Sequence, residues 1–169
     1  DRRLTKDKLY KLKFTSQSNF KSVSEWFDSG LDVEIVIFFG QSNGAITQLT
    51  KYASGPDRAW KDCGVFTCEP ESFHLNAEIV RWEKSMWGSA MLYVLTEKDP
   101  GTEKTQTFSF SPTYDMGNGV KTTVTHSVSV KTTDEDDPLG SSIVEYCDNT
   151  DGDGTMYTPG KVYMWVNQF

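Results

Sequence analysis

The feature that most constrains the fold is a two-residue alternation, which is clearest between residues 120 and 130. Alternate positions are mostly apolar and the positions between them carry Lys, Thr or Ser: the first set is Val120, Thr122, Val124, His126, Val128 and Val130. Successive side chains of a strand point to opposite faces, so this pattern predicts a half-buried antiparallel strand. The helical period of 3.6 residues is almost absent from the chain.

The same alternation predicts nine strands, with one helical turn at 23–27. The expected strands are 8–14, 32–39, 45–53, 72–82, 89–96, 104–110, 120–130, 142–147 and 161–168. Residues 89–96 (SAMLYVLT) are apolar on both faces, which favours a central strand. At 169 residues the chain is long enough for one well-packed domain spanning 1–169. The sequence therefore predicts an all-β fold, an antiparallel β-sandwich of about eight or nine strands.

Residues 36–45 (VIFFGQSNGA) resemble the first block of the SGNH hydrolases, in which the serine is the nucleophile. Such an enzyme needs alternating strands and helices, and a late Asp-x-x-His block to activate the serine. Neither His74 nor His126 follows an Asp by three residues, and we expect a surface residue and a core residue there. Asn43-Gly44 instead favours a type I′ hairpin turn. We therefore expect a non-enzyme in which Ser42 is a turn residue, and keep an esterase as the least favoured alternative.

Acidic residues gather at one end of the expected sandwich. If consecutive strands are antiparallel, the loops 15–31, 54–71, 97–103 and 131–141 lie at the same end. This end then collects Asp28, Asp32, Glu97, Asp99 and the run Asp134-Glu135-Asp136-Asp137. Carboxylates so close together repel each other unless they are solvated or neutralised, and Ca²⁺ takes six to eight oxygen ligands from flexible loops. A net charge of −7 argues against a nucleic-acid partner.

The segment 128–146 (VSVKTTDEDDPLGSSIVEY) resembles the third loop of C-two domains, the calcium-dependent lipid-binding sandwiches. In that family a strand ends in Asp-x-Asp, further acids follow, and a hydrophobic-Gly pair opens the next strand; Asp134, Asp136, Asp137, Leu139 and Gly140 match that order. The resemblance implies that these aspartates share Ca²⁺ with Asp28 and Asp32 of the first loop, and that an anionic lipid surface is a candidate partner. The architecture expected is C-two-like or jelly-roll-like. A solvated acidic loop tip is the alternative.

Residues 149–157 (NTDGDGTMY) resemble the first part of an EF-hand or dockerin-type calcium loop. In such a loop Asn149, Asp151 and Asp153 curl their oxygens around one ion, Gly154 takes a positive φ, and the Thr155 carbonyl is the next ligand. Position 12 is Gly160, where the family has a bidentate Glu. The alternative is a hairpin loop rich in Asx and Gly.

The tryptophans suggest a second kind of ligand. Exposed Trp82, Trp87 and Trp165 would form a platform for sugar rings, with Trp165 on the face opposite Val162, Met164 and Val166. If these tryptophans are buried instead, they are aromatic residues of the core. Trp26 and Phe27 beside Asp28 would suit insertion into a lipid surface.

The three cysteines do not decide between an oxidising and a reducing compartment. Cys63 and Cys68 can close a short disulfide with Cys147 as a free thiol, or all three can be reduced. No run of about 18 apolar residues predicts a transmembrane segment. We expect a secreted or cell-surface, non-catalytic, calcium-binding β-sandwich module. A carbohydrate-binding or adhesin module that uses exposed Trp and Tyr is the alternative function.

Overall fold

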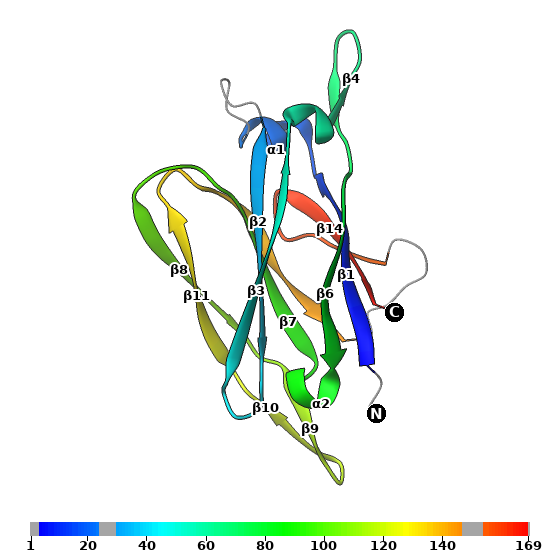
Figure 1. Ribbon diagram of the computed structural model, residues 1–169, viewed down its shortest axis with the longest axis vertical. Coiled ribbons are helices and arrows are strands. Elements are labelled where there is room, and N and C mark those ends of the chain that lie inside the picture. Colours follow the sequence, from blue (N-terminus) through cyan, green and yellow to red (C-terminus); the bar gives the residue numbers. More distant parts are fainter. Residues whose placement is uncertain (1–3, 24–29, 147–153, 169) are drawn as a thin grey trace.

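The computed structural model describes residues 4–23, 30–146 and 154–168, and these residues form an all-β sandwich-like fold (Figure 1). One antiparallel sheet has the order β13 (Thr155–Tyr157), β14 (Val162–Gln168), β1 (Leu4–Phe14), β6 (Phe73–Glu83). A second has the order β12 (Asp137–Glu145), β7 (Ala90–Glu97), β2 (Leu31–Gly40), β3 (Ile46–Gly55). The all-β sandwich predicted from the alternation is confirmed.

The main core lies between these two sheets. Alternate residues of β1 and β14 face it, and so does one face of β2 and β7; Leu12, Met164, Ile35 and Tyr93 are completely buried there. The apolar side chains supply the core and the intervening residues remain outside, as the two-residue period requires.

A third layer covers the outer face of β2 and β7. The hairpin β8 (Glu103–Phe110) and β11 (His126–Thr133) packs there through Phe110, Val128 and Val130, against Val36, Phe38, Leu92 and Val94. Every residue of β7 is therefore buried. This is the central strand predicted from the run of apolar residues at 89–96.

The segment 120–130 is not a single strand. β10 (Val120–Thr123) pairs with β9 (Thr113–Gly117) in a separate hairpin, and the chain resumes as β11 at His126. The alternation continues across the break, so period alone cannot locate it. Val120, expected on the buried face, is 57% exposed.

The segment 54–71, expected to be a loop, carries a short helix η1 (Asp57–Ala59) and the hairpin β4 (Lys61–Cys63) and β5 (Cys68–Pro70). A disulfide joins Cys63 to Cys68 across this hairpin, which decides between the two alternatives for these cysteines. Cys147 lies outside the described residues.

Both α-helices found among the described residues are short. α1 (Gln17–Lys21) begins after Ser16, whose hydroxyl accepts a hydrogen bond from Asn19 N at 3.0 Å, and α2 (Lys84–Trp87) follows β6. The helical turn expected at 23–27 falls largely outside the described residues. α1, the β4–β5 hairpin and the connections β7–β8 and β11–β12 all lie at the upper end in Figure 1, as the loop alternation predicted.

Candidate metal centre

Three carboxylates converge at the upper end of the second sheet. Glu97 is the last residue of β7 and Asp137 the first of β12, and the two are directly paired across these strands. Asp99 follows Glu97 by two residues, a spacing that keeps two side chains on one face of an extended backbone. Carboxylate oxygens of all three residues lie within 4.8 Å of one another.

Glu97 is the unusual member of this cluster because it is only 2% exposed. Its Oε2 has no hydrogen-bond partner among the described residues, and its Oε1 accepts only a long 3.5 Å hydrogen bond from Asp32 N. Burial above all, together with the side-chain contact to Asp99 and the negative charges of Asp99 and Asp137, raises the pKa of Glu97 to about 8, and the Asp32 N–H only partly opposes this shift. A buried carboxylate without a partner is costly, so this oxygen calls for a proton or a cation.

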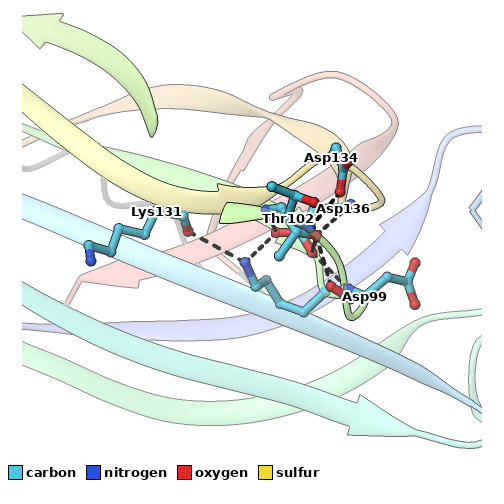
Figure 2. A network of polar contacts seen from close by, with 7 residues as sticks. Asp99, Thr102, Lys131, Asp134 and Asp136 are labelled. Atoms are coloured by element: carbon cyan, nitrogen blue, oxygen red, sulfur yellow. Dashed lines mark hydrogen bonds and ion pairs between the residues drawn. The ribbon is translucent and has the colours of Figure 1, made fainter. Parts of the chain in front are cut away.

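Asp136 lies in the tight turn between β11 and β12 and has a different role (Figure 2). Its side chain is 1% exposed and pairs with the Lys98 ammonium. Its carboxylate also accepts hydrogen bonds from Asp99 N at 2.7 Å and from Thr133 N at 2.8 Å. Burial by itself would raise the pKa of Asp136, but these hydrogen bonds, that from Lys98 above all, outweigh it and lower the pKa.

The structure thus separates the three aspartates that were expected to share an ion. Asp137 belongs to the carboxylate cluster, whereas the contacts of Asp136 tie together the connections β7–β8 and β11–β12. Asp134 Oδ1 accepts a hydrogen bond from Thr102 N at 2.7 Å, and its own N donates to Thr102 O at 3.0 Å. The loop expected at 131–141 is only Asp134–Asp136, because β11 runs to Thr133 and β12 begins at Asp137. In so short a turn, aspartates satisfy backbone N–H groups.

We expect Asp136→Asn to destabilise the protein by about 2 kcal/mol, since it leaves Lys98 without its counter-charge. Because the pKa of Asp136 is lowered, this contribution is present above about pH 4 and is lost as the pH falls further. Urea denaturation measures it, with Asp134→Asn as a control that keeps an acceptor for Thr102 N and should change stability by less than about 0.5 kcal/mol.

Of the remaining expected ligands, Asp32 and Thr155 are described by the structure and are not part of this cluster. Asp32 lies at the start of β2, where its backbone N contacts Glu97 and its backbone O accepts a hydrogen bond from Lys98 N at 2.9 Å. Asp28, Asn149, Asp151 and Asp153 lie outside the described residues. Thr155 opens β13, opposite Val166, and Gly154 has a φ of 91°, the positive value predicted for it.

Ser42 lies in the β2–β3 hairpin turn, as expected. The turn type differs from the prediction: Gly44 N donates to Gln41 O at 3.0 Å and Gln41 N to Ala45 O at 2.8 Å, which encloses a three-residue loop. Gly44 has a φ of 92°, whereas Asn43 is not among the described residues with positive φ, so this is not a type I′ turn.

The histidines occupy the two environments predicted for them. His74 is exposed, and His126 is buried with its Nε2 2.9 Å from the Tyr114 hydroxyl. Trp82 is buried and its Nε1 donates to Gly88 O at 2.9 Å, while Trp87 packs edge-on against Phe39. Of the three tryptophans considered for sugar binding, Trp165 is the one on an outer sheet face.

Comparison with known proteins adds no relative: no protein-family model, no curated protein and no solved structure matches this chain. The resemblances to C-two domains and EF-hand loops therefore stay predictions. Within the described part of the chain, none of the helices has the length and apolar character needed to cross a bilayer.

Proposed function

We propose that the protein is a non-catalytic binding module whose upper end is held in shape by a calcium ion bound to Glu97, Asp99 and Asp137. The observation that carries the proposal is the unpartnered, buried Oε2 of Glu97 within a cluster of three carboxylates. A cation at this position would supply the missing partner and neutralise the mutual repulsion of the three groups.

The ligand chemistry favours calcium. All three side chains offer oxygen, which hard cations prefer, and water can complete the six to eight ligands that Ca²⁺ takes. Lys161 Nζ lies 3.7 Å from Asp137 Oδ1 and offsets part of the negative charge. We therefore expect an affinity in the range of extracellular modules, a Kd of about 0.1–1 mM.

The main effect of such an ion would be structural. It would join the end of β7, the turn that follows it and the start of β12, and so fix the connections at this end of the sandwich. The Cys63–Cys68 disulfide fixes the neighbouring hairpin and supports a location outside the reducing cytosol. The disulfide and the proposed calcium ion both favour a secreted or cell-surface binding module.

Thermal unfolding with and without 10 mM CaCl₂ tests the site. If the Kd is about 0.1 mM, the ion adds about 2.7 kcal/mol and raises the Tm by about 5 °C or more, reversibly with chelator. Glu97→Gln should abolish this shift. Glu103→Gln, at the exposed start of β8, is the matched control and should retain it.

Glu97→Gln has a second expected effect that excludes simple misfolding. Because the pKa of Glu97 is raised from 4.5 to about 8, its ionisation costs stability as the pH rises through this range without the ion. The variant should thus be more stable than the original protein at pH 7.5 in chelator, yet unresponsive to calcium. A calcium shift that survives Glu97→Gln would refute the proposed site.

A further inference from the structure

The outer face of the sheet β13-β14-β1-β6 carries one continuous row of side chains. His74, Lys11, Trp165 and Met156 are paired with one another in register across β6, β1, β14 and β13. Met156 is 51% exposed, His74 is exposed, and Trp165 is half-buried on the side of β14 opposite its core residues. Strands lie about 4.8 Å apart, so the row extends for about 14 Å across the sheet.

A β-bulge in β1 adds a second aromatic ring, that of Tyr10, to this row. The pairing of β1 with β14 shifts between Leu9 and Lys11, so that Leu9 and Leu12 both face the core. Tyr10 and Lys11 share the outer face between them, since Lys11 Nζ lies 5.6 Å from the Tyr10 ring centroid and 4.7 Å from that of Trp165. Bulges re-aim side chains in this way and occur next to functional sites.

Ring contacts extend the row on both sides. The Tyr10 ring meets His74 edge-on at 5.4 Å, and Tyr163 lies 6.0 Å from Trp165. Lys8 Nζ lies 5.9 Å from the Tyr10 ring centroid. Rings and ammonium groups thus alternate over three neighbouring strands, and we call this surface, formed by Lys8, Tyr10, Lys11, His74, Met156, Tyr163 and Trp165, the aromatic-basic face.

The charge of this face is opposite to that of the chain as a whole. β1 contains Lys6, Lys8, Lys11 and Lys13, and its single acid, Asp7, is buried. Glu78 of β6, the cross-strand partner of Lys8, lies 3.3 Å from Lys6 Nζ and offsets one of these four positive charges. The whole chain has a net charge of −7. Lysines concentrated on one strand of an acidic protein give a local positive potential that attracts anions.

We propose that the aromatic-basic face binds an acidic polysaccharide, a chain of sugar rings that carry carboxylates. A row of side chains that crosses several strands of a sheet suits an extended polymer. Tyr10, Tyr163 and Trp165 provide ring surfaces for the sugars, and Lys8 and Lys11 provide charge for the carboxylates. Nucleic acid is the less favoured polyanion, because its dense phosphate charge is repelled by the rest of an acidic protein.

Affinity electrophoresis in native gels that contain polygalacturonate tests this proposal. The buffer contains EDTA, so that the result is independent of the proposed calcium site. We expect retardation by polygalacturonate, weakened by added salt, and none by dextran, a neutral polysaccharide. Trp165→Ala should weaken binding about tenfold or more, and Lys11→Ala about fivefold. Lys104→Ala, on exposed β8, is the matched control and should bind like the original protein.

If Trp165→Ala does not fold, Lys11→Ala still tests the proposal, because Lys11 lies outside the core. Thermal unfolding of each variant shows whether it is folded. Absence of retardation, or equal retardation of the original protein and Lys11→Ala, would overturn the proposal. Equal retardation by dextran would remove the role of charge. Tighter binding of a single-stranded oligothymidylate than of polygalacturonate would make nucleic acid the occupant instead.

Discussion

We expect Asp7→Asn to stabilise the protein by about 4 kcal/mol at pH 7 and to change its stability little at pH 4. Asp7 lies in β1 and is completely buried. Its Oδ1 has no hydrogen-bond partner among the described residues, and its Oδ2 receives only a 3.5 Å hydrogen bond from Gln168 Nε2. Burial raises the pKa of Asp7 to about 8, and the contact with Gln168 offsets only part of this effect.

The sign follows from proton binding. The unfolded chain ionises Asp7 near its ordinary pKa of 3.8, whereas the folded protein keeps the group protonated up to about pH 8. Between these two pH values, each rise of one pH unit lowers the free energy of unfolding by about 1.4 kcal/mol. Asparagine has nearly the shape of the protonated acid and does not ionise, so it removes this cost.

Urea denaturation of both proteins at pH 4 and pH 7 measures the difference. Other groups titrate in this range too, but they contribute equally to both proteins and cancel in the comparison. Asp62→Asn, on the exposed β4–β5 hairpin, is the control and should give the same small difference at both pH values. A benefit of Asp7→Asn that does not grow with pH would show that the buried carboxyl is not the cause.

How far the sequence predicts this fold depends on what each residue pattern records. Alternation records which side of a strand is buried, and it correctly placed Trp165 outside. A run that is apolar on both faces records a strand covered on both sides, and it correctly placed residues 89–96 in the centre. It does not record what covers a face. Val128 and Val130 alternate as they would in a two-layer sandwich, yet they pack in a third layer against Val36 and Phe38.

The candidate site shows the same limit. Spacing along the chain gathered the acids at one end and identified Asp137 among them, but the cluster depends on pairing between strands. Glu97 ends an apolar strand and meets Asp137 only through the register of β7 with β12. A β-bulge between Pro138 and Gly140 sets this register. Apart from this proline and this glycine, no residue pattern in the sequence predicts the bulge.

Gly140→Ala should cost about 4 kcal/mol, because it combines backbone strain with a clash against backbone atoms. Gly140 has a φ of 117°, which side chains rarely tolerate. A Cβ there would lie 2.2 Å from Pro159 O and 2.8 Å from Gly160 N. Gly140 and Gly160 form an antiparallel bridge, and Lys161 N donates to Leu139 O at 2.9 Å, so this contact joins the two sheets of the sandwich.

Gly119→Ala separates the two contributions. Gly119 also has a positive φ, of 79°, but no atom lies within 4 Å of the position of an added Cβ. It should therefore show strain alone, about 1 kcal/mol. Urea denaturation of both variants at one pH gives the difference. An equal cost would mean that the junction at Gly160 yields easily; a larger cost for Gly140→Ala, accompanied by weaker calcium binding, would mean that the junction also positions Asp137 at the start of the same strand.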